Sequence, residues 1–306
     1  MFSGIGGFDL ALRNQGHEIV GACEIDKYAR EIYAKQFPGV PIHHDATNLH
    51  PQSLPYFDVL CAGFPCQAFS IAGKRRGFED TRGSLFFEIA RIAKEKKPSY
   101  LILENVKGLL SHDKGHTFRT IIRTLDEVGY DAEWQIINSK YFVPQSRERI
   151  FIIGHTRGER TRQIFPIGIN DTEVKGKGGK EMQAVVNDNG ILRFVENCTA
   201  LDANYYKGLD NHGQRTMIKA VCIENWNANG RRIKEVGDPQ FTLSQNCGVG
   251  ITQGSRIRRL TPVECERLQG FPDNWTDGIS DTQRYKCVGN AVTVPVVEYI
   301  VKELFN

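Results

Sequence analysis

The sequence predicts an α/β fold: a Rossmann-like, mostly parallel sheet with helices on both faces, together with a small, loop-rich β domain. Three observations predict it. Short apolar runs alternate with amphipathic helical patterns from residue 1 to about residue 155. Between residues 170 and 255 glycine and asparagine become frequent and helical periodicity is lost. The 306 residues also exceed the usual size of one compact domain.

The first elements follow from apolar runs and their boundary residues. Residues 2–5 are apolar and lead into a glycine-rich turn, and residues 9–15 form a short helix that Gly16 ends. Residues 19–25 read as a strand. Asp26 can then cap a helix, because its side chain can accept hydrogen bonds from the first turn.

The same alternation continues beyond the second helix. Four segments rich in apolar residues read as strands, of which residues 100–103 form a continuous apolar run typical of a strand buried on both faces, and two further segments repeat apolar residues at helical spacing. These predictions are strands at residues 57–62, 100–103, 132–137 and 150–153, and helices at residues 85–96 and 118–128.

The carboxyl-terminal part carries a helix-start signature. Thr261 can cap, Pro262 suits the first helical position, and Glu264 completes a capping box. Residues 295–304 form a last helix that packs on the first domain. The predicted boundaries are residues 1–168 plus 288–306 for the large domain, 169–256 for the loop-rich domain, and 257–287 for a connecting hinge.

Composition is that of an ordinary globular protein. The net charge of +3 permits a nucleic-acid partner without arguing for one. No apolar stretch is long enough for a membrane span, and we expect no signal peptide before Phe2. None of the eight cysteines forms a Cys-x-x-Cys pair, and the histidine groups lack a third ligand, so we expect a reduced, intracellular protein without a metal.

One cysteine lies at a position where an α/β fold is expected to place its active site. Cys66 comes directly after Pro65 and four residues after the apolar run 57–62, and so lies at the carboxyl end of a strand, where open α/β sheets place their active sites. A thiolate there is a nucleophile. A lone cysteine is more often a small buried hydrophobe, which is our interpretation of Cys23, Cys61 and Cys287.

Other polar residues also sit at strand ends. Glu104 ends the strand that begins at Tyr100, and Asn105 shapes the turn after it. Arg147 and Arg149 lie two apart on an extended segment and therefore point to the same side. Taken alone, each of these charges has an ordinary interpretation as an ion-pair partner or a solvated surface residue.

A candidate ligand site lies near the amino terminus. The glycine turn that begins at Phe2 is similar to a dinucleotide-binding loop but lacks the full Gly-x-Gly-x-x-Gly spacing. Glu24 closes the next strand, where an acidic side chain can hold ribose hydroxyls, and Asp45 could accept a hydrogen bond from an adenine amino group.

Taken together, blocks of residues along nearly the whole chain closely resemble the DNA (cytosine-5)-methyltransferases, in particular the compact bacterial restriction–modification enzymes. They occur in the order of that family: Phe2-Ser-Gly-Ile-Gly-Gly7, Glu24, Asp45, Gly63-Phe-Pro-Cys-Gln-Ala-Phe-Ser70, Glu104-Asn-Val106, Gln145-Ser-Arg-Glu-Arg149, Arg259-Leu-Thr-Pro-Val-Glu-Cys-Glu-Arg-Leu-Gln-Gly270 and Gly289-Asn-Ala-Val292.

The resemblance implies a reaction and its catalytic residues. A methyl group passes from S-adenosylmethionine to C5 of a cytosine flipped out of a specific duplex DNA sequence, and Cys66 bonds transiently to C6. Glu104 would neutralise the charge that this addition pushes onto the ring. Arg149 would hold the base through its carbonyl oxygen, and Arg147 would support the site.

It also implies binding residues, with residues 169–256 as a target-recognition domain. Ile25 stands where some relatives place an aromatic ring against the adenine. The implied cofactor residues are Phe2, Gly4, Gly6, Gly7, Glu24, Ile25, Asp45, Pro65, Leu85, Asn290 and Val292. The implied DNA-binding residues are Gln67, Ser70, Arg82, Gln145, Tyr205, Arg231, Arg232 and Thr242.

One departure concerns the amino terminus. Relatives carry several residues before the glycine block, and these form a central first strand, whereas here Met1 directly precedes Phe2. We expect that strand to be almost absent, with lower stability and weaker cofactor binding as the result.

The expected setting is the cytoplasm, with nucleoid association, for a protein encoded by a prokaryote or by a phage. The partner is double-stranded DNA, the protein is a monomer, and a cognate restriction endonuclease would act separately. Three alternatives stay open: a transfer-RNA cytosine-5 methyltransferase, a catalytically silent DNA-binding regulator, and a nicotinamide oxidoreductase. The last would explain only the glycine turn.

Overall fold

The structure, a computed structural model, describes residues 1–65, 85–158, 162–167, 184–188, 191–195, 198–199, 212–221, 250–251 and 255–305. The chain folds as two compact units. The first comprises Met1–Ser139, Glu148–Glu173 and Ala291–Asn306, and the second comprises Lys140–Arg147 and Val174–Asn290. The segment 140–147 and the whole of the predicted hinge, residues 257–287, therefore belong to the second unit.

A four-stranded sheet forms the centre of the first unit. Its order is β3 (Val59–Gly63), β4 (Tyr100–Val106), β7 (Glu148–Thr156) and β5 (Tyr130–Asn138). β3 and β4 are parallel, and β7 is antiparallel to both of its neighbours, so β3, β4 and β5 run in one direction. β7 is reversed because a short connection without a crossover helix joins it to β5. The predicted Rossmann-like, mostly parallel sheet is confirmed, with β7 as the exception.

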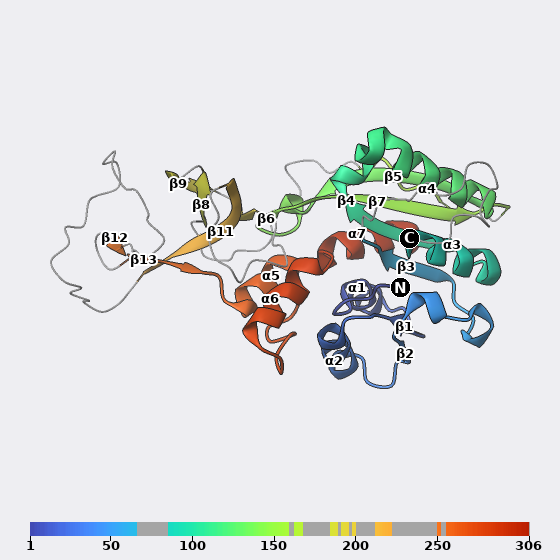
Figure 1. Ribbon diagram of the computed structural model, residues 1–306, viewed down its shortest axis with the longest axis horizontal. Helices are drawn as coiled ribbons and strands as arrows, with labels where there is room; N and C mark the ends of the chain where they lie inside the picture. The colour runs from blue at the N-terminus through green and yellow to red at the C-terminus, as the bar shows by residue number, and fades with distance from the viewer. Residues whose placement is uncertain are drawn as a thin grey trace. The chain divides into compact units, whose positions relative to one another are not determined.

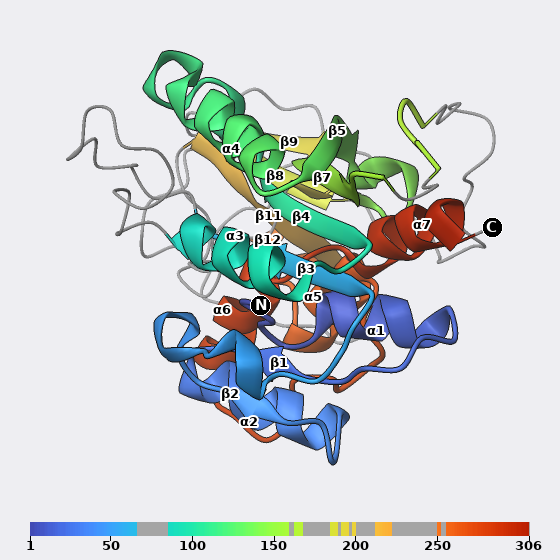
Figure 2. The same ribbon diagram turned by 90° about the vertical axis from the view of Figure 1, so that its right-hand side faces the viewer.

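Helices cover both faces of this sheet (Figures 1 and 2). α3 (Leu85–Lys96) and α4 (His116–Glu127) share one apolar core with the strand residues of one face, Leu101 and Leu103 among them. Side chains alternate along a strand, so Tyr100 points to the other face. Its ring lies 5.2 Å from that of Phe305 in α7 (Val294–Phe305), and α7 also contacts α1 (Gly7–Asn14).

The amino-terminal elements lie next to β3 (Figure 2). β1 (Ala22–Cys23) and β2 (Ile42–His43) pair in parallel, and α2 (Lys27–Gln36) lies between them in the sequence. The predicted cap is confirmed, because the Asp26 carboxylate accepts hydrogen bonds from the first turn of α2. The strand predicted over residues 19–25 is shorter than expected, with regular pairing at two residues only.

The first three residues bridge β1 and β3. The Ser3 amide donates to the carbonyl oxygen of Cys23 at 3.0 Å, and the amino group of Met1 donates to that of Cys61 at 2.6 Å. Beyond this bridge, a groove of about 1250 Å³ is lined by residues of the β1 segment, such as Ile19, and of the β3 segment, such as Phe57. Residues 1–3 therefore link two strands without forming a regular strand themselves.

Short 3₁₀ turns complete the helical elements. They are Ala46–Asn48, Pro51–Ser53, Lys107–Leu110, His112–Gly115 and Ser139–Tyr141.

The described strands of the second unit are mostly antiparallel, as predicted for a β region. The larger sheet has the order β12-β13-β11-β8-β9, and β6 pairs in parallel with β10. Their bounds are β6 Gln145–Ser146, β8 Ala184–Asp188, β9 Ile191–Val195, β10 Cys198–Thr199, β11 His212–Val221, β12 Gly250–Ile251 and β13 Ser255–Arg259.

Two helices follow β13 in the second unit. α5 (Pro262–Gln269) begins with the predicted capping box, in which the Thr261 hydroxyl accepts from the Glu264 amide and the Glu264 carboxylate accepts from the Thr261 amide. α6 (Asp281–Asn290) was not predicted. Much of the segment expected to be a connecting hinge is therefore helical.

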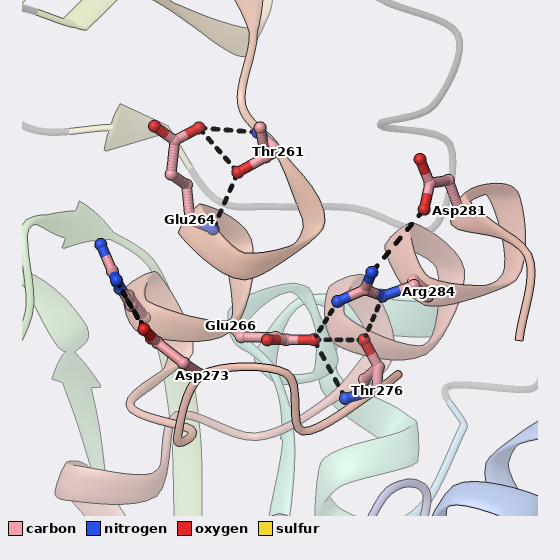
Figure 3. Close-up of polar contacts among 8 residues, drawn as sticks. Thr261, Glu264, Glu266, Asp273, Thr276, Asp281 and Arg284 are labelled. Carbon is pink, nitrogen blue, oxygen red and sulfur yellow. Dashed lines mark hydrogen bonds and ion pairs between the residues drawn. The ribbon is translucent and has the colours of Figure 1, made fainter. Parts of the chain in front are cut away.

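A buried carboxylate holds these two helices together (Figure 3). Glu266 of α5 is fully buried, and its Oε1 accepts hydrogen bonds from the Thr276 amide at 3.0 Å and from the Thr276 hydroxyl. The Arg284 guanidinium of α6 donates to the same oxygen at 3.0 Å. Since a buried charge needs a partner of opposite charge, this cluster fixes α6 against α5.

Removing the cation should destabilise the second unit. Arg284→Met leaves the Glu266 carboxylate buried without its counter-charge, and we expect a loss of about 3–5 kcal/mol in the free energy of unfolding. Urea denaturation followed by circular dichroism measures it.

The matched control is Arg267→Met in α5. Arg267 pairs with Asp273 at 2.5 Å, but both side chains are largely exposed, so the same chemical change should alter stability little. Equal losses in the two variants would contradict a special role for the buried cluster.

Candidate active site

The pairing of β3 with β4 sets the geometry of the predicted site. Gly63 lies opposite Glu104 in the parallel register. A Cβ atom placed on Gly63 would lie 3.5 Å from Oε2 of Glu104, so the carboxylate lies against the last residue of β3. Three residues further along the chain comes Cys66, which lies outside the described residues, as do Gln67, Ser70 and Arg82.

Asn105 fixes the end of β3. Its side chain is buried, its Nδ2 donates to the carbonyl oxygen of Phe64 at 2.8 Å, and its Oδ1 accepts from the Val106 amide at 2.8 Å. Asn105 therefore holds the backbone just before Pro65, which is exposed. The structure gives Asn105 the turn-shaping role predicted from the sequence.

Glu104 forms an ion pair with Arg149. Nε of Arg149 lies 3.1 Å from Oε1 of Glu104, and the two side chains are only 19% and 13% exposed. Burial lowers the pKa of Arg149 from its ordinary value, and the neighbouring Glu104 carboxylate partly offsets this. Because an arginine remains charged even so, the strand ends present an oriented pair of opposite charges.

Arg147 and Gln145 belong to the second unit. Both side chains are buried. Nη1 of Arg147 donates to the Gly289 carbonyl at 3.2 Å, and Nε2 of Gln145 donates to the Leu268 carbonyl at 2.9 Å. The DNA contact predicted for Gln145 would therefore require its side chain to leave this position.

The glycine turn leaves room for a ligand. Phe2, Gly4 and Gly6 all have positive φ angles, of 55°, 54° and 85°. A Cβ atom on Gly4 would meet nothing within 4 Å, whereas one on Gly6 would collide with the Phe37 ring. Gly6 is therefore explained by packing, and Gly4 lies where a ligand can approach the backbone before α1 begins at Gly7.

Glu24 is held firmly beside this turn. Its Oε2 accepts from the Gly4 amide at 2.8 Å and its Oε1 accepts from the Asp26 amide at 2.8 Å. Ile25 next to it is 72% exposed, which is unusual for a large apolar side chain. A carboxylate and an apolar face thus stand side by side at the end of β1.

Asp45 follows β2 and caps the turn Ala46–Asn48. Its Oδ1 accepts from the amide and the hydroxyl of Thr47, at 2.9 Å and 2.8 Å. These hydrogen bonds lower the pKa of Asp45 below its ordinary value, so the group is an oriented carboxylate at neutral pH.

The remaining predicted cofactor residues lie in different settings. Leu85 is half-buried at the start of α3, Val292 is buried in the first unit, and Asn290 is exposed at the end of α6 in the second unit. The predicted DNA-binding residues Tyr205, Arg231, Arg232 and Thr242 lie outside the described residues.

The described part of the chain contains neither a candidate metal site nor a candidate membrane span. No three His, Cys, Asp or Glu side chains there form a group that could hold a metal ion. No described helix has the length and apolar character needed to span a bilayer.

Comparison with known proteins decides which family these features represent. The family model of the C-5 cytosine-specific DNA methylases matches residues 1–306. The chain belongs to this family. The cytosine C5 methylase also resembles Type II methyltransferase M.HhaI of Haemophilus parahaemolyticus, with 37% identity over 98% of this chain and 91% of that protein.

Two further likenesses extend this result. The methylase is 32% identical to Orphan methyltransferase M.SPRI of Bacillus phage SPR, over 100% of this chain and 96% of that protein. The solved structure of a Spodoptera frugiperda DNMT2 mutant superimposes with a TM-score of 0.67 at 19% identity and covers 100% of this chain and 98% of that one. At that identity the structural likeness shows the fold alone. The family match makes the protein an enzyme that methylates cytosine at C5 in DNA.

The half-buried carboxyl of Asp9, near the glycine turn, should make the stability of the methylase depend on pH. Burial raises the pKa of Asp9 to about 6, although the amino group of Met1, the Tyr33 hydroxyl and Arg13 act against this. An unfolded Asp has a pKa of about 3.9, so the folded state holds the proton more tightly, and stability falls as pH rises from about 4 to about 6.

Asp9→Asn removes the loss of stability that ionisation of this carboxyl causes in the folded protein. We expect the variant to be more stable than the parent protein at pH 8, by about 2–3 kcal/mol, and equally stable at pH 4, where the native carboxyl is neutral. Urea titrations at both values measure it, with the exposed Glu18→Gln as control. A gain that does not change with pH would contradict the proposed ionisation of Asp9.

Proposed function

We propose that the protein transfers a methyl group from S-adenosylmethionine to C5 of a flipped-out cytosine in a specific duplex DNA sequence, through a transient covalent bond between Cys66 and C6 of the base. The observation that carries this proposal is the strand register that sets Glu104 against Gly63, three residues before Cys66, with Arg149 paired to the same carboxylate.

The nucleophile follows from the chemistry of cytosine. C5 of the free base is a poor nucleophile, and it becomes enamine-like when the Cys66 thiolate adds to C6 and the C5–C6 double bond opens. S-adenosylmethionine, when bound, supplies an electrophilic sulfonium methyl group. After the methyl group has bonded to C5, loss of the C5 proton and departure of the Cys66 sulfur restore the double bond.

Glu104 and Arg149 manage the charge that develops on the ring. Sulfur addition at C6 moves negative charge toward N3 and the carbonyl oxygen of the base. Once protonated, Glu104 donates a hydrogen bond near N3, and the Arg149 guanidinium donates to the carbonyl oxygen. Their ion pair orients both side chains before the base arrives, which reduces the reorganisation needed during the reaction.

The base must leave the duplex for this geometry to be reached. C6 is inaccessible inside the stack, and unstacking a base costs a few kcal/mol, which pocket contacts offset. The loop from Gln67 to Arg82 and residues 169–256 would supply the DNA contacts and the sequence readout, with Tyr205, Arg231, Arg232 and Thr242 as proposed readers.

The first unit fits S-adenosylmethionine. Glu24 keeps unused lone pairs on both oxygens and can accept hydrogen bonds from ribose hydroxyls, while the open Cα of Gly4 lets the ligand reach the turn. Exposed Ile25 offers a flat apolar contact for adenine, and Asp45 an acceptor for its amino group. The other proposed contacts are Phe2, Gly6, Gly7, Pro65, Leu85, Asn290 and Val292.

The cellular setting is part of the proposal. We infer a monomer that acts on double-stranded DNA in the cytoplasm of a bacterium, or of a phage-infected one, close to the nucleoid. A cognate endonuclease would act separately. The names of the relatives, Type II and phage-encoded methyltransferases, support this setting. Duplex DNA and transfer RNA compared as methyl acceptors test the choice of substrate.

Cys66→Ser should abolish methyl transfer and leave DNA binding intact. Duplex DNA with 5-fluorocytosine at the target position should trap the parent protein as a covalent adduct, because fluorine at C5 cannot leave as a proton would. Cys66→Ser should form no adduct, and the control Cys61→Ser should form it normally. Failure of the parent protein to form an adduct with donor present would overturn the nucleophile assignment.

Glu24→Gln should weaken binding of S-adenosylmethionine. The substitution removes the charge that strengthens hydrogen bonds to hydroxyl groups, so we expect a dissociation constant about 10- to 100-fold higher. Titration calorimetry without DNA measures it. Glu31→Gln, an exposed change in α2 of the same unit, is the control, and equal effects of the two would argue against a ribose contact.

A further inference from the structure

Two buried side chains hold the segment that precedes Arg149. Gln145 is fully buried and Arg147 is 4% exposed. Gln145 reaches the Leu268 carbonyl near the end of α5, and Arg147 reaches the Gly289 carbonyl near the end of α6. The last carbonyl groups of a helix have no partner within the helix, and the negative end of its dipole favours a cation. Both contacts therefore give a hydrogen-bond donor to a carbonyl group near the end of a helix.

The two helix ends are themselves joined. Nε2 of Gln269, the last residue of α5, donates to the Val288 carbonyl of α6 at 3.2 Å. The buried Glu266–Arg284 ion pair joins the same two helices independently of this bond, so α5 and α6 form a rigid support that does not depend on Gln269. Gln145 and Arg147 are attached to that support, one to each helix.

The backbone of the same segment pairs with the loop-rich region. β6 is parallel to β10, with Gln145 opposite Cys198 and Ser146 opposite Thr199. β10 lies within residues 169–256, where we propose DNA sequence readout. A shift of β10 would therefore move β6 directly.

Arg149 lies close to this segment in the sequence but belongs to the first unit. Arg149 is two residues beyond Arg147, and a two-residue step spans at most about 7 Å. Arg149 is ion-paired to Glu104 at 3.1 Å. The position of the Gln145–Arg147 segment is thus passed to Arg149 with almost no slack in the chain.

We propose that Gln145 is a positioning residue for methyl transfer rather than a DNA contact. Its hydrogen bond to α5, with that of Arg147 to α6, fixes the segment that carries Arg149 toward Glu104, and its pairing with β10 couples sequence readout to the catalytic carboxylate. This inference rests on the proposed roles of Glu104 and Arg149.

Gln145→Met tests it. Methionine keeps the length of the side chain and removes the amide donor. A small misplacement of a catalytic group costs up to about 10²-fold in rate, so we expect the single-turnover rate to fall between tenfold and that value. The Kd for cognate DNA and the KM for S-adenosylmethionine should stay at parent values. If the methionine variant does not fold, Gln145→Asn replaces it in the same measurements, because asparagine keeps the amide group on a shorter side chain.

The matched control is Gln269→Met. Gln269 is equally buried, and its amide likewise donates to a helix carbonyl in the same unit, but it does not belong to β6. We expect the control to lower the melting temperature as much as Gln145→Met does and to leave the single-turnover rate unchanged.

The possible outcomes distinguish a failure of the positioning role of Gln145 from a failure of the proposed function. A parent-like rate for Gln145→Met, an equal rate loss in Gln269→Met, or a loss confined to DNA affinity would each overturn the positioning role. Glu104→Gln and Arg149→Met are measured in parallel. If these two retained full transfer, the proposed function itself would fail; if they lost it while Gln145→Met did not, only the present inference would.

Discussion

The parallel register of β3 and β4 is the constraint on which the site depends. It sets Glu104 opposite Gly63 and brings the Phe64 carbonyl within reach of the Asn105 amide. A slip of one residue would turn the Glu104 side chain to the other face of the sheet. The site therefore needs the apolar runs of both strands to specify pairing, and Asn105 to end it at the right residue.

Ion pairs with little exposure to solvent also organise the structure. Two arginine–glutamate pairs sit where solvent hardly reaches, Arg149 with Glu104 and Arg284 with Glu266. The first lies at strand ends, where a substrate can approach, and the second joins two helices. Buried pairs of this kind give orientation more than net stability, because desolvation consumes much of their attraction. In the proposed function, the first pair serves the geometry of the reaction, whereas the second pair serves the architecture of the second unit.

Much of the fold could be predicted because apolar periodicity and caps act locally. The bounds of α3 match the prediction, and Asp26 caps α2 as expected. α6 was missed because it has few apolar residues and is held by Arg284, whose partner is 18 residues away. The position of Arg147 could not be predicted either. The extended two-residue spacing predicts that Arg147 and Arg149 point to the same side, but β6 ends at Ser146 before Arg147 and β7 begins at Glu148, so the two side chains have different surroundings.

Exposed Ile25 has a thermodynamic consequence. Water covers most of this side chain in the free protein, next to the charged Glu24. A planar ring that stacks on it would release that water, and burial of apolar surface lowers the heat capacity of the system. The binding of such a ligand beside Ile25 should therefore become more exothermic as the temperature rises. This temperature dependence of the binding enthalpy would distinguish apolar stacking from purely polar binding.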